Sequence, residues 1–180
     1  MVYVHFAEGF EEIEAITIVD VLRRADIETA SVSVTGEKAV NGGHGIQVYV
    51  DILFEDADYD GCGMIVLPGG GTGTDNLLAH KGLAAQIMAF NESGKYLAAI
   101  CAAPKVFGKL GVLKGKKATI YPGMEEHLAG AKSTGGRIVV DGNVITSKGP
   151  GTALEFSLAL VSILKDKEEA ARLRKSMIAI

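Results

Sequence analysis

The sequence predicts an α/β fold, a doubly wound sandwich in which helices cover both faces of a mostly parallel sheet. Two observations predict this fold. Short apolar runs alternate with segments of helical periodicity, which is the order that βαβ units produce. The composition, 48% hydrophobic and 22% charged over 180 residues, is typical of a compact body. We therefore expect a single domain over residues 1–180.

The elements follow from these patterns in chain order. Strands are expected at the apolar runs VYVHF, ETASVSV, MIVL and YLAAI. Helices are expected over Glu11 to Ala25, Asp75 to Asn91, from about Ala102, Gly151 to Lys165, and Lys167 to Met177. Before the last two of these helices, RIVVDGNVITS places an Asp-Gly-Asn turn between two apolar runs, which predicts a hairpin.

Charge and hydropathy argue against several classes of partner. The net charge is −4 with acids and bases interspersed, so the basic face that nucleic acids require is missing from the sequence. No apolar run approaches the roughly 18 residues of a membrane span, and the first residues do not resemble a signal peptide. We therefore expect a cytoplasmic protein that binds neither nucleic acid nor membrane.

Three segments are expected to meet at one edge of the sheet. In open parallel sheets, ligands bind beyond the carboxyl ends of the strands. HFAEGFEE, LPGGGTGTDN and AICAAP each follow a predicted strand. The glycine cluster lacks the Gly-Lys-Ser/Thr ending of a phosphate loop and the third glycine of a dinucleotide fingerprint, so no cofactor is expected. Such a turn instead aims backbone N–H groups at one point, as an oxyanion hole does.

Cys101 lies where an apolar run ends and a helical pattern begins. The positive end of a helix dipole favours thiolate over thiol, and Pro104 fits the first turn of a helix. The small neighbours Ala102 and Ala103 leave the sulfur open to a ligand. The alternative is a buried, inert cysteine, a common fate of this residue type. Cys62 is expected at the opposite end of the sheet, more than ~13 Å away, so both cysteines should be thiols.

Two glutamates lie on the apolar side of the first predicted helix. On a helical wheel Glu11 and Glu14 share a face with Ile18, Val21 and Leu22. Acidic residues in a first turn complement the helix dipole, and this explanation needs no further function. Alternatively, a partly buried glutamate has a raised pKa, stays protonated and donates a hydrogen bond to a nearby thiolate.

Histidine and metal chemistry receive little support. The chain has four histidines and none directly follows Cys101. His44, in NGGHG, could approach the site from a glycine-rich loop. No two ligand-type residues show zinc spacing, so we expect no metal.

Four motifs together carry a family resemblance. AEGFEEIEAITIVDVLRRADI, IVLPGGGTGTDNL, LAAICAAP and TSKGPGTALEF resemble, in this order and spacing, the ThiJ/PfpI superfamily in its DJ-one branch. The resemblance spans nearly the whole chain. It implies a flavodoxin-like sandwich, a homodimer, a reactive cysteine at Cys101 and a protonated glutamate at Glu14.

The resemblance also implies further pocket residues, and this chain differs from the family at some positions. Oxyanion-type amides fall on Gly70 and Ala102, and the GPGT loop with Gly149 and Pro150 lines the pocket. Tyr121 stands where many animal members of the family carry a histidine, and a phenol is a poor general base at neutral pH.

His44 aligns with an arginine of some members, so we also expect it at the pocket. Ala102 replaces the histidine of the protease-like branch, so we expect no peptidase activity.

Two functions are compatible with these residues. The resemblance implies a cofactor-free enzyme of glyoxalase or deglycase type, in which Cys101 attacks a reactive 2-oxoaldehyde or an early glycation adduct. The alternative is an oxidative-stress sensor with chaperone-like output, in which Cys101 is oxidised to a sulfinate without turnover.

Overall fold

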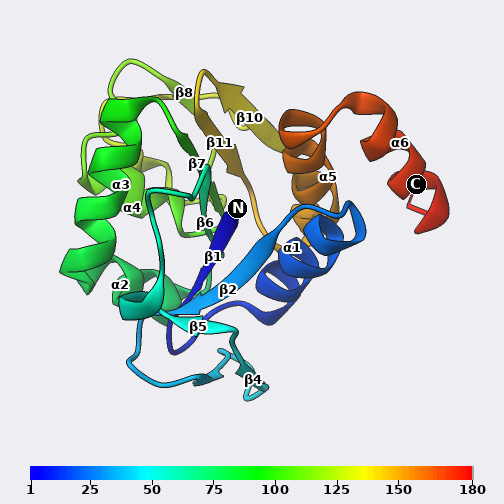
Figure 1. Ribbon diagram of the computed structural model, residues 1–180. Helices are drawn as coiled ribbons and strands as arrows, with labels where there is room; N and C mark the ends of the chain where they lie inside the picture. Colours follow the sequence, from blue (N-terminus) through cyan, green and yellow to red (C-terminus); the bar gives the residue numbers. More distant parts are fainter. Residues whose placement is uncertain (180) are drawn as a thin grey trace.

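The computed structural model describes residues 1–179 and contains a central sheet of seven strands in the order β10-β11-β7-β6-β1-β2-β5 (Figure 1). All neighbouring strands run parallel except β10 and β11, which form the predicted antiparallel hairpin. The strands are β1 Val2–Phe6, β2 Thr29–Ser33, β5 Ile52–Leu53, β6 Met64–Leu67, β7 Tyr96–Ile100, β10 Ile138–Asp141 and β11 Val144–Ser147.

Helices cover both faces of this sheet. The helices are α1 Glu12–Arg24, α2 Gly71–Ala79, α3 Lys81–Ser93, α4 Pro104–Lys109, α5 Ala153–Leu164 and α6 Lys167–Ser176. In Figure 1, α1, α5 and α6 lie on one side of the sheet, and α2, α3 and α4 lie on the other. The predicted fold class, an α/β sandwich of flavodoxin-like arrangement, is therefore confirmed.

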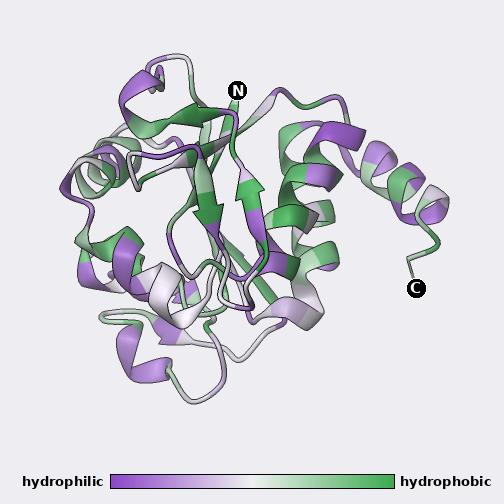
Figure 2. Cartoon of the chain, turned by 90° about the horizontal axis from the view of Figure 1, so that it is seen from below, coloured by the Kyte–Doolittle hydropathy of each residue, from purple (hydrophilic) through white to green (hydrophobic). Residues whose placement is uncertain are grey.

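The core has two parts because side chains of a strand alternate between the two faces of a sheet. Val2, Val4 and Phe6 of β1 pack toward α1 and α5, whereas Tyr3 packs into the cluster beneath α3 and α4. Hydrophobic residues gather in the central strands and on the inner sides of the helices (Figure 2). Among the described residues, no helix is long and apolar enough to cross a membrane.

One predicted element was wrong. The segment Asp75 to Asn91 was expected to be a single helix, but the structure has two, α2 and α3, which are separated at His80. His80 adopts an extended backbone, and its Nδ1 accepts a hydrogen bond of 3.0 Å from the N–H of Leu83, so the imidazole caps a new helix. In addition, α2 begins at Gly71, inside the predicted glycine turn.

The shorter elements were not predicted. Strands β3 Ala39–Asn41 and β4 Gln47–Tyr49 form a separate hairpin, and β8 Lys117–Ala118 pairs with β9 Lys132–Ser133. Single turns of 3₁₀ helix are η1 Phe54–Asp56, η2 Glu125–His127 and η3 Pro150–Thr152.

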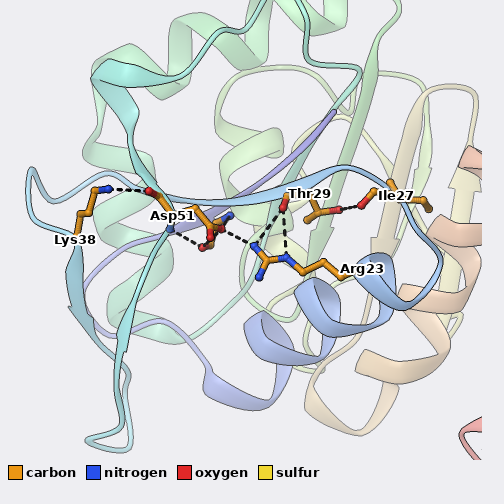
Figure 3. Close-up of polar contacts among 6 residues, drawn as sticks. Arg23, Ile27, Thr29, Lys38 and Asp51 are labelled. Carbon is orange, nitrogen blue, oxygen red and sulfur yellow. Dashed lines mark hydrogen bonds and ion pairs between the residues drawn. The ribbon is translucent and has the colours of Figure 1, made fainter.

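A polar cluster ties the end of α1 to the neighbouring strand (Figure 3). The guanidinium of Arg23 donates to the carbonyl of Thr29 at 3.2 Å and to the carboxylate of Asp51 at 2.6 Å. The same carboxylate accepts hydrogen bonds from the N–H and the hydroxyl of Ser31, at 2.7 and 2.6 Å. These bonds connect the end of α1, the helix that carries Glu14, to β2.

The strand order places the expected site. From β1 the chain first pairs on one side, with β2, and later on the other side, with β6, so the direction of winding reverses between β1 and β6. Ligands in such sheets bind at this reversal, beyond the carboxyl ends of the strands. The loops that follow β1, β6 and β7 meet there.

Candidate active site around Cys101

Cys101 directly follows β7 in a backbone conformation that L-residues other than glycine rarely adopt. Its φ angle is +63°, in the left-handed region. The Cys101 N–H donates to the carbonyl of Ser147 at 3.0 Å, and the Cys101 carbonyl accepts from the N–H of Tyr121 at 2.8 Å. These two hydrogen bonds hold Cys101 in the strained backbone conformation. Strained residues of this kind are common at functional sites.

The predicted surroundings of Cys101 are confirmed in part. Pro104 occupies the first turn of α4, as expected, but α4 begins three residues after the cysteine and has only six residues. Register pairs Met64 with Tyr96, so Cys62 lies before β6 and Cys101 after β7, at opposite ends of the sheet. Both are free cysteines, as predicted.

Glu11 and Glu14 have separate roles in the structure. Glu11 is the N-cap of α1, and its Oε2 accepts a hydrogen bond of 2.7 Å from the N–H of Glu14. Glu14 is completely buried, and its Oε2 accepts a hydrogen bond of 2.7 Å from the N–H of Gly69. Glu11 is therefore explained by its role at the start of the helix, where an acidic residue caps the backbone N–H groups. Glu14 instead faces Cys101.

Burial and the repulsion between two negative charges determine whether Glu14 and Cys101 are protonated. Burial raises the pKa of the Glu14 carboxyl to about 7, and the Gly69 N–H and the Cys101 thiol oppose this increase. Burial also raises the pKa of the Cys101 thiol to about 12, and the negative charge of Glu14 adds to the rise. The amides of Gly70 and Ala102 hydrogen-bond to the sulfur and lower the same pKa.

This balance corrects the expectation from the helix dipole. A helix end was expected to be enough to favour the thiolate, but burial beside Glu14 outweighs it when Glu14 is ionised. The raised pKa of Glu14 was predicted correctly. The two ionisations oppose one another, so the state of the sulfur depends on the proton of Glu14.

Glycines let the loop after β6 approach the pair closely. A Cβ on Gly69 would lie 2.5 Å from Cys101 Cβ and 2.8 Å from Glu14 Oε2, so a side chain cannot fit there without displacing the site. Gly70 has φ +89°, and a Cβ there would meet the carbonyl of Gly9. Sequence reasoning included Gly70 but not Gly69, although the glycine cluster itself was the signal.

A cavity of about 330 Å³ opens beside the sulfur. Of the residues predicted for the pocket, Cys101, Ala102 and Tyr121 line it, and Tyr121 is 47% exposed. Gly149 lies behind the ring of Tyr121, which a Cβ on Gly149 would approach to 3.3 Å. Pro150 starts the next 3₁₀ turn and is not part of the wall. The wall also contains residues that sequence reasoning missed: Gly71, Thr74, Asp75, Lys105 and Met124.

His44 does not line this cavity, contrary to the expectation that it would join the pocket. Its backbone N–H and its Nδ1 both bond to the carboxylate of Glu12, at 2.6 and 2.8 Å. Ligand-type atoms of Glu11, Glu12 and His44 lie within 4.8 Å of one another. Spacing in the sequence did not reveal this cluster, because the loop that carries His44 folds back onto the start of α1.

Comparison with known proteins identifies the family. The model of the DJ-1/PfpI family matches residues 1–163. The chain belongs to this family. Protein dj-1beta of Drosophila melanogaster is 39% identical over 175 residues, which cover 96% of this chain and 93% of that protein.

Protein DJ-1 homolog B of Arabidopsis thaliana is 38% identical over 178 residues, or 98% of this chain and 41% of that protein, so the chain spans less than half of this relative.

Solved structures agree with this membership. The structure of oxidized Toxoplasma gondii DJ-1 matches with a TM-score of 0.94 at 34% identity and covers 98% of this chain and 97% of that one. A more distant relative, from Pyrococcus abyssi, is named a deglycase and is 33% identical over 161 residues, 88% of this chain and 96% of that protein. The resemblance stated from four motifs is therefore confirmed.

Proposed function

We propose that this DJ-1/PfpI protein is a cofactor-free cysteine enzyme of glyoxalase or deglycase type, acting on reactive 2-oxoaldehydes or early glycation adducts. One observation carries the proposal. A fully buried glutamate with a pKa raised to about 7 lies beside a cysteine whose sulfur receives two backbone N–H groups and faces a cavity. A carboxyl group with this pKa both donates and accepts protons near neutrality.

The first step follows from the opposed ionisations. Glu14 accepts the thiol proton, and the sulfur attacks the aldehyde carbon, so that a C–S bond forms and the carbonyl π electrons move to oxygen. The amides of Gly70 and Ala102 stabilise the negative charge, first on sulfur and then on oxygen. Glu14 passes its proton to that oxygen, which gives a hemithioacetal and leaves the carboxylate able to act as a base.

The second step needs a base that is also an acid. Glu14 removes the proton from the former aldehyde carbon, and the neighbouring carbonyl oxygen takes up a proton, which gives an enediol. Glu14 then returns its proton to the neighbouring carbon while the hydroxyl on the sulfur-bearing carbon loses its proton, which yields a thioester of a 2-hydroxy acid. Water cleaves the thioester, releases the acid and restores the thiol. The hydroxyl of Tyr121, at the mouth of the cavity, supplies a hydrogen-bond donor rather than a base. We include no peptidase activity in the proposal, since Ala102 follows the nucleophile.

The test is conversion of methylglyoxal to lactate by the purified chain. We expect Cys101→Ala to abolish turnover and Cys62→Ala, which removes the other buried cysteine, to retain it. Absence of turnover in the wild-type chain, or equal activity of the two variants, would refute the enzyme assignment.

A second function is favoured by a specific comparison, because one closely matching structure is of an oxidized DJ-1. Here the thiolate reduces one peroxide to water and becomes a sulfenate, and a second peroxide takes it to the sulfinate. Protonated Glu14 would then donate a hydrogen bond to a sulfinate oxygen. Mass spectrometry after mild peroxide treatment should show two added oxygens on Cys101, without methylglyoxal turnover, if the chain is a sensor with chaperone-like output.

We also propose a homodimer formed through α1. Ile13 and Ile16 on this helix are 58% and 46% exposed, and Ile16 shares a groove of about 290 Å³ with Tyr49, which is 80% exposed. A second copy of this chain would cover these side chains. Ile16→Glu should give a monomer by light scattering, whereas Val140→Glu, at an exposed apolar position on the edge strand β10, should not. The cytoplasmic location stays a prediction.

A further inference from the structure

The wall of the cavity beside Cys101 carries charged groups that the mechanism above does not use. Lys105 on α4 and Asp75 on α2 both line the cavity, and Nζ donates to Oδ1 at 2.7 Å. The side chain of Lys105 is only 20% exposed, whereas that of Asp75 is 63% exposed. The ammonium is therefore held in the wall, while its carboxylate partner reaches solvent.

Thr74, in the same wall, independently indicates a missing partner. The residue is 1% exposed, and across residues 1–179 its Oγ1 has no hydrogen-bond partner. Buried hydroxyl groups in folded proteins are nearly always hydrogen-bonded, because burial without a partner is costly. A rotation of the Thr74 side chain toward the cavity would let its hydroxyl bond to an oxygen atom of a ligand there.

We propose that the cavity selects aldehydes that carry a carboxylate, with Lys105 as the specificity-determining residue and the Thr74 hydroxyl as a second contact. This inference rests on the proposed attack by Cys101. An ammonium group has three N–H donors, and Asp75 uses one of them, so donors remain for a second carboxylate. A cavity of about 330 Å³ has room for a small aldehyde with such a group.

The ion pair with Asp75 sets how strongly an anion is bound. Asp75 partly neutralises Lys105 and repels a second carboxylate, but its exposed side chain can turn to water when a ligand enters. Removal of the Asp75 charge should therefore improve recognition of an anion. Removal of the Lys105 charge should weaken it, so the two substitutions have opposite effects.

Alkylation of Cys101 tests whether Lys105 favours reagents that carry a carboxylate, and it does not require enzymatic turnover. Iodoacetate and iodoacetamide transfer a similar carbon unit to sulfur and release iodide, but only iodoacetate carries a carboxylate. We would measure both rates at Cys101 by peptide mass spectrometry. Lys105→Met should lower the ratio of the iodoacetate rate to the iodoacetamide rate about three- to tenfold, the size of one partly buried charged hydrogen bond, and Asp75→Asn should raise it.

Lys109→Met is the matched control, because Lys109 lies one turn along the same helix and is exposed. It should leave the ratio unchanged. Glyoxylate, an aldehyde with a carboxylate, should also protect Cys101 from iodoacetamide at a lower concentration than neutral glyoxal does, in the wild-type chain but not in Lys105→Met.

Equal ratios in the two lysine variants, or no rise in Asp75→Asn, would overturn the inference. Lack of methylglyoxal turnover with these shifts intact would instead overturn only the proposed enzyme.

Discussion

The proton on Glu14 should make the stability of the folded chain depend on pH in an unusual direction. In the unfolded chain this carboxyl loses its proton near pH 4.5, whereas in the folded chain it keeps the proton to about pH 7. Between these values the folded state binds more protons than the unfolded state. The free energy of unfolding contributed by Glu14 therefore falls as pH rises, with a limiting slope of about 1.4 kcal/mol per pH unit.

Integrated over this window, the contribution is about 3 kcal/mol, a large part of the stability of a typical domain. The substitution Glu14→Gln isolates it, because the amide keeps the shape, accepts the hydrogen bond from Gly69 and does not titrate. Urea unfolding of both proteins should be measured from pH 4.5 to pH 7.5. The wild-type chain should lose about 3 kcal/mol relative to Glu14→Gln over this range.

Glu92→Gln is the matched control, since it makes the same chemical change on an exposed part of α3. Its stability should run parallel to that of the wild-type chain. If the curves of Glu14→Gln and wild type are also parallel, the pKa of Glu14 is the same in the folded and the unfolded chain. A carboxylate with an ordinary pKa is too weak a base to take the thiol proton of Cys101 near neutrality, so the proposed first step would lose its support.

Three more predictions address the reactive pair and its support. Glu14→Leu should slow iodoacetamide alkylation of Cys101 at pH 7 at least several-fold more than Glu14→Gln does, because the glutamine amide can still donate a hydrogen bond to the thiolate and leucine cannot; equal rates would contradict the pairing. Gly69→Ala should lower the free energy of unfolding by about 1–3 kcal/mol through overpacking. Gly71→Ala, with open space at its Cβ, should change it by less than about 1 kcal/mol, and the same urea assay compares them. Burial lowers the pKa of His5 to about 3, so the stability that neutral His5 contributes should be lost as pH falls from 6.5 toward 3, and in the same urea assay the wild-type chain should lose stability relative to His5→Phe over this range.

The sequence predicts the sheet and the position of the reactive residues because both depend on local patterns. Apolar runs of four to seven residues separated by helical segments determine which residues form parallel strands, and the helical wheel was enough to place Glu14 on the buried face of α1. The split at His80 was not predictable in this way, because a histidine is not a typical helix cap. The same is true of the left-handed turn at Cys101, since cysteine rarely adopts it.

Contacts between segments distant in the sequence were also not predicted. The ion pair between Lys105 and Asp75 exists because α2 packs against α4, and no sequence spacing records that packing. His44 was expected at the pocket on the basis of an alignment with an arginine. Its bond to Glu12 depends instead on the path of a loop that contains three glycines. Such contacts require the relative placement of elements, which local periodicity does not contain.

Two features of the site are unfavourable for folding, and both are consistent with a functional role. The left-handed backbone at Cys101 and the buried carboxyl of Glu14 each cost folding free energy, and neither improves the packing of the core. Gly69 permits both groups to approach, since any side chain there would separate them. An inert buried cysteine would need neither the strain nor the acid. The combination is explained if the chain keeps a sulfur and a proton acceptor adjacent, so that the ionisation of one always depends on the other.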